Sequence, residues 1–446
     1  MNFSKEELIE IGKYIRTIRK KRGFKLEDLA DENISSSTIS NIEKGVEGVS
    51  DEKRNYFYQK MGFDHVSIPR LIEEEKKNDY WIKTQLSYIE HLIDLGEPQV
   101  GLQELRKLEL NTDYLKGSKY FLRGRAYVVQ GKETEKAEPY FKKALELIKQ
   151  SSSDPFNYRS SCYNQLGKIS YYNNRFADAL RYTDKGIYTY IKSSEYNQHL
   201  IFSLLMNKVV YLNKIGYRDK ASSVLDQLWQ RENEIHNVDV IANMYDLQAT
   251  IHMENELYSQ ALETAEKGLR IARINKLSYR TVELLLTIGK TLMAMNKFTE
   301  AKTALNTALK LKGQVKQKHG FLPVYNQLGK LFLIQKKPEE AKKIIETAIN
   351  EKAIAKDMVR YVDALLTLGQ SLIEQGHINE AIELYLETKE LTEQHSLLSQ
   401  QHEVFFRLCE IWKEKDSVEY NSFLSKKFEV ELELRKRNGG DDYALR

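Results

Sequence analysis

The residues that could bind phosphate, bind a metal or act as nucleophiles do not have the spacing that these functions need. Gly289-Lys290-Thr291 is similar to the end of a phosphate-binding loop, but no glycine stands five residues earlier and no strand-like segment precedes it. The nine histidines include no His-Glu-x-x-His motif and no cluster with metal-ligand spacing. Cys162 and Cys409 are expected to be small buried hydrophobic residues. We therefore expect no catalytic residue, no metal and no cofactor, and we predict that the protein is not an enzyme.

The composition indicates a globular chain. Of the 446 residues, 41% are hydrophobic and 30% are charged, which disfavours disordered, collagen-like and membrane proteins. No apolar run approaches the ~20 residues that cross a bilayer, and the N-terminus lacks the apolar core of a targeting signal. Two cysteines cannot build a disulfide framework. We therefore predict a cytoplasmic protein with no membrane partner.

A period of about 40 residues organises most of the chain. In four periods a glycine is followed twelve positions later by alanine, as in Gly167 and Ala179 or Gly289 and Ala301. The diverged pairs Val209/Ala221 and Ala249/Ala261 keep this interval, and Gly124/Ala137 exceeds it by one. The alanines stand at positions 137, 179, 221, 261, 301, 341 and 381. Two antiparallel helices approach closely only where they present small side chains. The period therefore predicts a series of antiparallel helix pairs joined by polar turns.

This pattern resembles the tetratricopeptide repeat family from about residue 76 to residue 430. The resemblance implies an all-α right-handed superhelix of about eight helix pairs, whose concave groove binds peptides or proteins. In that family the first helix of each pair faces the groove, mainly through the positions three before and one after the small residue. The candidate peptide-binding residues at these and neighbouring inward positions are Asn164, Lys168, Tyr171, Asn207, Asn243, Asp246, Lys290, Asn326 and Lys330.

The chemistry of these candidates suits an extended peptide. One asparagine amide can donate to a peptide carbonyl and accept from a peptide N–H, whatever the peptide's side chains are. Lysines in the same groove would meet acidic side chains or a C-terminal carboxylate. The alternative interpretation is a solvated polar face that binds nothing.

Residues 6–63 follow a different pattern of short helices. Leu8, Ile11, Ile15 and Ile18 share one face of a first helix. The segment LEDLADEN predicts a second short helix, and TISNIEKG predicts a third that ends at Gly45. The first 25 residues carry eight lysines and arginines against three acidic residues, although the net charge of the whole chain is only +4. This distribution predicts a small domain with one positive edge.

The small domain resembles the helix-turn-helix of the Cro/phage-repressor class. The matching residues are Ile15-Arg16, Ile18-Arg19, Gly23, Leu29-Ala30, Thr38-Ile39-Ser40, Ile42-Glu43 and Gly45. In that class the second helix of the motif enters the major groove of DNA. The resemblance implies that base edges are faced by Ser36, Ser37, Thr38 and Asn41, and that phosphates lie near Ser40 and Lys44. It also implies an ion pair between Arg19 and Glu43, although a direct DNA role for these two residues is the alternative.

Two further basic residues are candidates for phosphate contacts. Lys25 stands where the class often has a Thr-Gln pair that touches DNA, and it could replace that contact as a point charge. Arg16 lies on the basic side of the first helix. For both residues a solvated helix surface is the alternative.

The whole chain resembles the RRNPP group of cytosolic peptide-pheromone receptors, particularly the PlcR and NprR type. The resemblance implies a quorum-sensing transcription regulator, a homodimer that binds double-stranded operator DNA and a short signalling peptide. The expected organisation is a helix-turn-helix domain over residues 1–66, a linker over 67–75, a peptide-sensing repeat domain over 76–435 and a flexible tail over 436–446. The residues leave open whether peptide promotes or releases DNA binding.

Two other functions remain open at this stage. Repeat proteins of the Rap type bind response regulators of phosphorelays, so this chain could inhibit such a partner, alone or beside a DNA-binding role. Alternatively, it is a phage or mobile-element repressor whose repeats bind a protein antirepressor.

Overall fold

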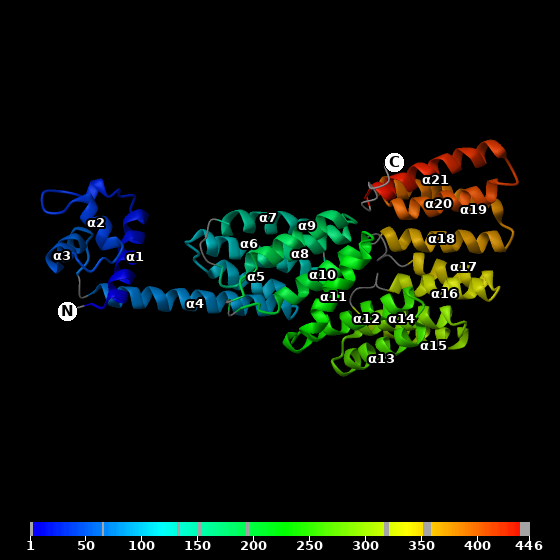
Figure 1. Ribbon diagram of the computed structural model, residues 1–446, viewed down its shortest axis with the longest axis horizontal. Coiled ribbons are helices and arrows are strands. Elements are labelled where there is room, and N and C mark those ends of the chain that lie inside the picture. Colours follow the sequence, from blue (N-terminus) through cyan, green and yellow to red (C-terminus); the bar gives the residue numbers. More distant parts are fainter. Residues whose placement is uncertain are drawn as a thin grey trace. The chain divides into compact units, whose positions relative to one another are not determined.

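The computed structural model is all-α, and its described part contains helices and no strands. It describes residues 3–64, 67–131, 134–149, 154–192, 194, 196–315, 321–350 and 358–437. Two compact units divide the chain: residues 1–110 with 125–132, and residues 111–124 with 133–446. Figure 1 shows the succession of helices along the chain. Of the tail expected over 436–446, residues 436 and 437 end the last helix, and the others lie outside the described residues.

The first unit begins with a small helical domain. Its elements are α1 (Lys5–Lys21), the 3-10 turn η1 (Glu27–Leu29), α2 (Ser36–Glu43) and α3 (Asp51–Lys60). Its core includes Ile11, Ile15, Ile39 and Phe57, each at most 2% exposed, which confirms the apolar face predicted for the first helix. Each of the three α-helices begins after a serine whose hydroxyl accepts a backbone N–H, the usual N-cap arrangement.

The prediction of a second short helix in this domain is wrong. The segment LEDLADEN forms only the 3-10 turn η1. The reason is local capping, because the Asp31 carboxylate accepts the backbone N–H groups of Asn33 and Ile34 and closes an Asx turn there. Tyr56 and Lys60 of α3 also donate to Asp31, at 2.7 and 2.5 Å. The chain therefore turns at Asp31 instead of continuing as a helix.

The boundary expected at residue 66 also requires correction. Helix α4 (Ile68–Asp94) is continuous for 27 residues, so the described part of the expected linker, 67–75, is mostly helical. Ile68 is fully buried and Ile72 is 8% exposed, and both belong to the core of the small domain. Lys76 of α4 pairs with Glu10 of α1. The first two turns of α4 thus complete the small domain, because their apolar residues at i and i+4 cover its remaining open side.

The same helix continues into the first pair of the repeat region, since α4 packs against α5 (Pro98–Lys107). The following helices are α6 (Asp113–Gln130), α7 (Thr134–Ile148), α8 (Tyr158–Tyr172), α9 (Phe176–Thr189), α10 (Leu200–Lys214), α11 (Arg218–Gln230), α12 (Val238–Glu254), α13 (Tyr258–Ile274), α14 (Ser278–Ala294), α15 (Phe298–Lys310), α16 (Leu322–Ile334), α17 (Pro338–Ile349), α18 (Met358–Glu374), α19 (Ile378–Gln394), α20 (Leu398–Trp412) and α21 (Ser417–Arg437). Short 3-10 turns, η2 (Glu232–Glu234) and η3 (Leu311–Gly313), follow α11 and α15. Consecutive helices pair in a tetratricopeptide-like superhelix, as the 40-residue period predicts.

Small residues allow the two helices of each pair to approach. The alanines of the period are at most 2% exposed. A Cβ atom added to Gly369 would lie 2.3 Å from the ring of Tyr385 on the paired helix, and one added to Gly289 would lie 2.7 Å from Leu305. Between the helices of a pair, the turn uses a residue with positive φ at the same place in each period: Asn174, Gly216, Glu256, Asn296, Lys336 and Gly376. This left-handed residue ends the first helix and reverses the chain.

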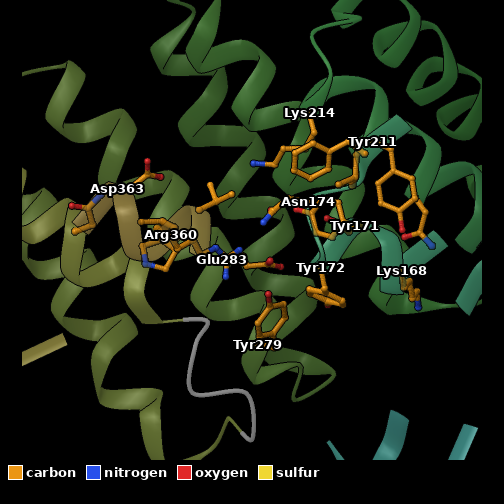
Figure 2. Close-up of a pocket in the computed structure, with 18 of the residues that line it drawn as sticks. Lys168, Tyr171, Tyr172, Asn174, Tyr211, Lys214, Tyr279, Glu283, Arg360 and Asp363 are labelled. Carbon is orange, nitrogen blue, oxygen red and sulfur yellow. The ribbon is translucent and has the colours of Figure 1, made fainter. Parts of the chain in front are cut away.

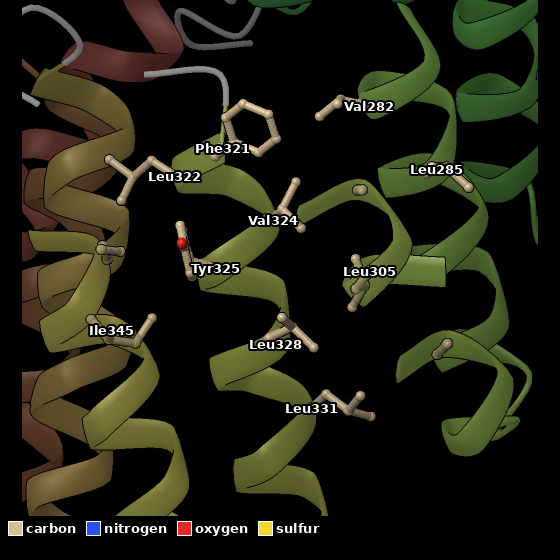
Figure 3. Packing of buried hydrophobic residues seen from close by; sticks show 14 of the residues in the cluster. Val282, Leu285, Leu305, Phe321, Leu322, Val324, Tyr325, Leu328, Leu331 and Ile345 are labelled. Carbon is tan, nitrogen blue, oxygen red and sulfur yellow. The ribbon is translucent and has the colours of Figure 1, made fainter. Parts of the chain in front are cut away.

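Apolar residues join each pair to the next. In the cluster shown in Figure 3, Val324, Leu328 and Leu331 of α16 lie on the side of α14 and α15, whereas Tyr325 faces the side of Ile345 on α17. Each pair therefore buries its apolar surface against both neighbours, which is the energetic basis of a repeat stack. Among the described residues, no helix has the length and hydropathy to cross a membrane.

Candidate functional site

A cavity of about 520 Å³ opens among the first helices of successive pairs in the second unit. Its lining comes from α8, α10, α12, α14, α16 and α18, together with Asn174 and Phe176 beside the end of α8. Seven of the nine residues predicted to bind a peptide line it: Lys168, Tyr171, Asn207, Asn243, Lys290, Asn326 and Lys330. The repeat register therefore brings residues from five helices to one cavity. Part of the lining is shown in Figure 2.

The other two predicted residues, Asn164 and Asp246, do not line the cavity. Asn164 is 5% exposed and its Oδ1 accepts a hydrogen bond from Asn207 Nδ2 at 2.8 Å. Asp246 Oδ1 accepts from Thr287 Oγ1 at 2.7 Å. Both partners lie on the first helix of the next pair. These polar atoms therefore hold neighbouring repeats together instead of facing the cavity.

Asn326 shares this arrangement although it lines the cavity. Thr367 Oγ1 donates to Asn326 Oδ1 at 2.6 Å, and Asn326 is only 7% exposed. In all three pairs, the acceptor stands three residues before the small position of its repeat, and the donor stands two before the small position of the next. We call these three pairs the inter-repeat ladder: Asn164–Asn207, Asp246–Thr287 and Asn326–Thr367.

One end of the cavity is aromatic. Tyr171 of α8 stacks on Tyr211 of α10 with ring centroids 5.2 Å apart, and it contacts Phe176 and Tyr172 at 5.6 Å each. Tyr211 is 2% exposed, and burial raises the pKa of its phenol well above the usual range. Figure 2 places Tyr171 and Tyr211 on the side of the cavity opposite Arg360 and Asp363. This end offers the half-buried rings of Tyr171 and Phe176 to a ligand, with the buried Tyr211 behind them.

The rest of the lining is strongly cationic. Six basic residues line the cavity, namely Lys168, Lys214, Arg280, Lys290, Lys330 and Arg360, against the two carboxylates of Glu283 and Asp363. Arg280 is neutralised locally: it donates to both oxygens of Asp239 at 2.9 Å and to Glu283 at 2.6 Å. Although burial opposes it, this pairing raises the pKa of Arg280. By count, the six cations of the lining outnumber its two carboxylates, which gives the lining a positive excess.

Two titratable groups have shifted pKa values: Lys290, which lines the cavity, and Asp246, which does not. Burial lowers the pKa of Lys290; Asp246 opposes this effect, and Lys214, Lys330 and Arg360 add to it by repulsion. Burial, with a contribution from the Glu283 carboxylate, raises the pKa of Asp246 to about 6. Such shifts mark places where the fold concentrates charge away from water.

Several lining residues were missed by sequence reasoning, notably Arg280, Glu283, Arg360 and Asp363. A periodic signal was available for them. Arg280 and Arg360 both stand nine residues before the glycine of their repeat, and each is followed three positions later by an acidic residue. The register used for prediction covered only the middle of each first helix, whereas these residues come from its first turns.

The cavity continues toward the C-terminal repeats. A smaller hollow of about 330 Å³ shares Lys330 and Asp363 with it and extends to Glu403 and Arg407 of α20. A wider cleft of about 1530 Å³ lies between the turns of α8 to α11 and the segment around 394–400. None of the nine predicted residues lines that cleft. The cavity over the first helices is therefore the candidate peptide site.

The candidate DNA-binding surface lies in the first unit. Helix α2 presents Ser37, Asn41 and Lys44 to solvent, whereas Ser36, Thr38 and Ser40 are half-buried. The Ser35 hydroxyl caps the helix and lies 2.8 Å from the hydroxyls of both Ser37 and Thr38. Among the described residues that could contact a base, Asn41 is therefore the exposed amide on this helix.

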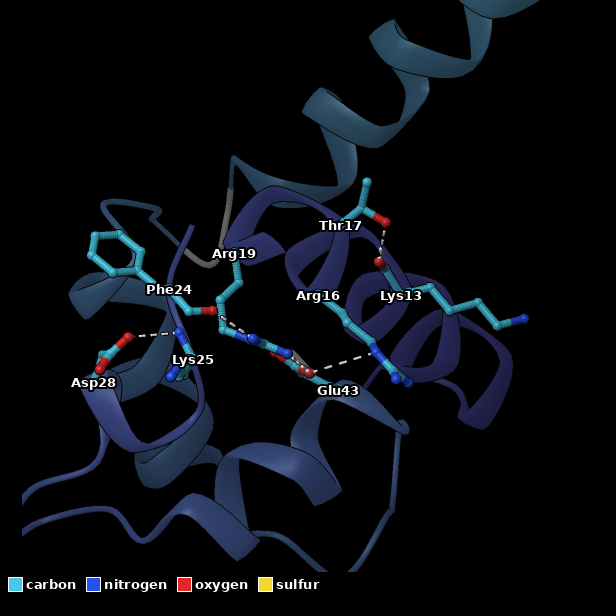
Figure 4. Close-up of polar contacts among 8 residues, drawn as sticks. All are labelled: Lys13, Arg16, Thr17, Arg19, Phe24, Lys25, Asp28 and Glu43. Atoms are coloured by element: carbon cyan, nitrogen blue, oxygen red, sulfur yellow. Dashed lines mark hydrogen bonds and ion pairs between the residues drawn. The ribbon is translucent and has the colours of Figure 1, made fainter. Parts of the chain in front are cut away.

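Arg19 and Glu43 fix α2 against α1. Arg19 Nε and Nη2 donate to the two carboxylate oxygens of Glu43 at 2.5 and 2.9 Å, and both residues are at most 6% exposed (Figure 4). Arg19 also donates to the Phe24 carbonyl at 2.7 Å. This geometry confirms the predicted ion pair and leaves neither charge available to DNA.

Arg16 and Lys25 are both exposed. Arg16 Nε lies 3.9 Å from Glu43 Oε2, at the edge of the buried pair. The Lys25 backbone N–H donates to the Asp28 carboxylate at 2.7 Å, which fixes the start of the turn while its side chain is exposed.

Comparison with known proteins supports the repeat assignment. The family model described as tetratricopeptide repeat matches residues 120–151, 282–314 and 322–353. A search of curated proteins gave no significant match.

Solved structures share the fold. The apo form of the quorum sensor NprR from B. thuringiensis aligns with a TM-score of 0.55 and 14% identity, covering 73% of this chain and 93% of that chain. NprR in complex with its cognate peptide NprX aligns with a TM-score of 0.58 and 16% identity, covering 79% of this chain and 99% of that chain. A Rap protein complexed with competence and sporulation factor aligns with a TM-score of 0.57 and 14% identity, covering 80% of this chain and 99% of that chain. At these identities the likeness is one of fold.

Proposed function

We propose that this chain is a peptide-responsive transcription regulator of the RRNPP group. A short linear peptide would bind in the cavity of the second unit, and the small domain of the first unit would bind operator DNA. The observation that carries the proposal is the cavity itself, which collects residues from the first helices of six successive pairs. A NprR of the same fold is described in complex with its cognate peptide, which supports a peptide as the ligand class.

The small domain supplies the DNA-binding part of the proposal. Its helix α2 presents exposed polar residues beside the basic first helix, and the buried Arg19–Glu43 pair holds the two helices together. We propose that Ser36, Ser37, Thr38 and Asn41 face bases, and that Ser40, Lys44, Lys25 and Arg16 approach phosphates. A homodimer acting in the cytosol would place two such helices on operator half-sites about 34 Å apart, or a multiple of that.

Capture of the ligand tests the proposal directly. The full chain is immobilised, exposed to the peptide fraction of spent medium from the source organism, and the retained peptides are identified by mass spectrometry. The expected result is enrichment of one short peptide, whose synthetic copy binds saturably in calorimetry. The same peptide should change the affinity of the chain for DNA selected from random duplexes. A chain that retains no peptide and selects no DNA sequence would contradict the proposal.

A second function has its own support. The Rap protein structure is covered over 99% of its length by a fold-level alignment that spans 80% of this chain. The repeats could therefore bind a response regulator and inhibit it, with or without DNA binding. Co-purification of the chain with response regulators of the source organism, with and without the captured peptide, separates this function from the first. A phage-type repressor would instead retain a protein antirepressor.

A further inference from the structure

The cavity holds more positive charge than its own carboxylates balance. Once Arg280 is assigned to Asp239 and Glu283, the lining contains Lys168, Lys214, Lys290, Lys330 and Arg360 against Asp363. Asp363 Oδ1 already accepts a hydrogen bond from Gln400 at 3.3 Å. Asp246 lies just outside the lining and is engaged by Thr287. The excess is therefore a property of the cavity and not of one residue.

Lys290 and Lys330 both line the cavity, and Lys330 is one of the cations that repel Lys290. They stand one residue after the glycine in consecutive repeats, on α14 and α16. Neither ammonium forms a hydrogen bond, or an ion pair of 4 Å or less, with another described residue. Lys290 is half-buried, and the pKa of its ammonium is lowered by burial and by the neighbouring cations. Lys330 is exposed, and the Asp246 carboxylate already opposes the lowering of the Lys290 pKa. An anion beside both lysines would offset the remaining repulsion, because the half-buried Lys290 ammonium would gain a second opposite charge.

The aromatic end adds a second requirement. The half-buried rings of Tyr171 and Phe176, backed by the buried Tyr211, lie at the other end of the same cavity from Arg360. A ligand that fills the whole cavity must therefore carry an apolar or aromatic group at some distance from its anionic group. A short peptide with one acidic group and one large apolar side chain meets both conditions.

We propose that the cavity selects acidic peptides, with a carboxylate bound between Lys290 and Lys330 and a large apolar side chain packed on Tyr171 and Phe176. This inference rests on the proposed peptide-receptor function and specifies its ligand class. The carboxylate is either an Asp or Glu side chain or the C-terminus of the peptide, since both present the same two oxygens.

Defined peptide pools test the inference. The full chain is exposed to random heptapeptides that each contain one Asp or Glu, and to a matched pool with Asn or Gln at that position. Each pool is made with a free and with an amidated C-terminus. We expect the acidic pool to be retained about tenfold more than the amide pool, the usual strength of one charge-assisted contact. If the C-terminus is the bound carboxylate, that preference follows the free terminus instead of the side chain.

Charge-removing variants connect the preference to the two lysines. Lys290→Met with Lys330→Met keeps the aliphatic stems, and we expect it to abolish the tenfold preference. Lys343→Met, at an exposed lysine of α17 outside the cavity, is the matched control and should keep it. Thermal unfolding of each variant checks that the chain remains folded.

Three outcomes would overturn the inference. Equal retention of all pools means that the chain binds peptides without selecting an acid, so the proposed function survives and the inference fails. A preference that persists in the double variant assigns the selection to other residues. Retention of no pool rejects the inference and the peptide-receptor function together.

Discussion

Thr367 donates its hydroxyl to Asn326 Oδ1 at 2.6 Å, across the gap between the first helices of two neighbouring repeats. The same relationship joins Thr287 to Asp246 and Asn207 to Asn164. The amide oxygen of an asparagine that was predicted to bind a peptide backbone therefore already accepts a hydrogen bond within the fold. Mutation of these residues should therefore lower the free energy of unfolding of the repeats, whether or not it also changes the affinity for a ligand.

A double-mutant cycle measures this ladder. Asn326→Ala, Thr367→Val and the double variant are compared by urea unfolding, and we expect a coupling free energy of about 1 kcal/mol, the net value of one buried hydrogen bond. Asn243→Ala is the control, because Asn243 lines the same cavity and has no side-chain hydrogen bond to a described residue. Its stability should change little. Additive effects of Asn326 and Thr367 would show that their contact contributes nothing.

Asp246 makes the stability of the repeat unit depend on pH. Its pKa in the folded chain is about 6, against about 4 for an unperturbed aspartate. Because the folded pKa is raised, the folded state binds the proton more tightly than the unfolded state does. The resulting penalty is full above pH 6 and disappears as the pH falls toward 4.

The variant Asp246→Asn isolates this effect, since the amide oxygen can still accept from Thr287. We expect Asp246→Asn to be more stable than the parent at pH 7.5, by up to about 2 kcal/mol, and equally stable near pH 4. Thermal unfolding across this range gives the comparison. A difference that is independent of pH would mean that the carboxylate has an ordinary pKa.

Much of this fold was predictable because the contacts between paired helices require small residues at regular positions in every repeat. The alanines at positions 179, 221, 261, 301, 341 and 381 are buried as their period requires. The position after the small residue also identified Lys168, Lys290 and Lys330 as cavity residues. Both predictions depend on local helix geometry alone, and this geometry is the same in every repeat.

The failures have a common physical cause. Asn164 and Asp246 bond to side chains 43 and 41 residues away, and such contacts depend on how neighbouring helices pack. Ile68 and Ile72 were assigned to a linker because the repeat period had not yet begun there. Their apolar spacing showed one helical face, but the sequence did not show that the core of the small domain would cover it.

Gly12 is predicted to be essential for the small domain. A Cβ at this position of α1 would lie 2.5 Å from the Ile42 carbonyl oxygen and 2.7 Å from that of Glu43, so α1 and α2 could not keep their distance. We expect Gly12→Ala to destabilise this domain by about 1–3 kcal/mol, the usual cost of overpacking. Gly48→Ala is the control, because nothing lies within 4 Å of its added Cβ. Hydrogen exchange of α1 and α2 in the full chain distinguishes the two variants.

Glu43 should act through structure and not through DNA contact. Removing one partner of a buried ion pair leaves the other charge uncompensated, so Glu43→Gln should destabilise the small domain by about 3–5 kcal/mol. The double variant Arg19→Met with Glu43→Leu should recover much of that loss, because no charge remains buried. If Glu43→Gln proves as stable as the parent in hydrogen exchange, the pair does not hold α2.

Asn41 provides the complementary test, because its side chain is exposed and has no hydrogen bond to a described residue. An asparagine can bond twice to adenine, and such a contact discriminates bases by about 1–3 kcal/mol. We therefore expect Asn41→Ala to weaken binding to the selected operator about tenfold or more, while affinity for random DNA, thermal stability and peptide affinity stay unchanged. Gln59→Ala, at an exposed amide on α3, is the matched control. Fluorescence anisotropy at fixed salt compares the three proteins, since phosphate contacts make absolute affinities depend on ionic strength. If Asn41→Ala and the parent distinguish operator from random DNA equally well, α2 does not read the bases through this residue.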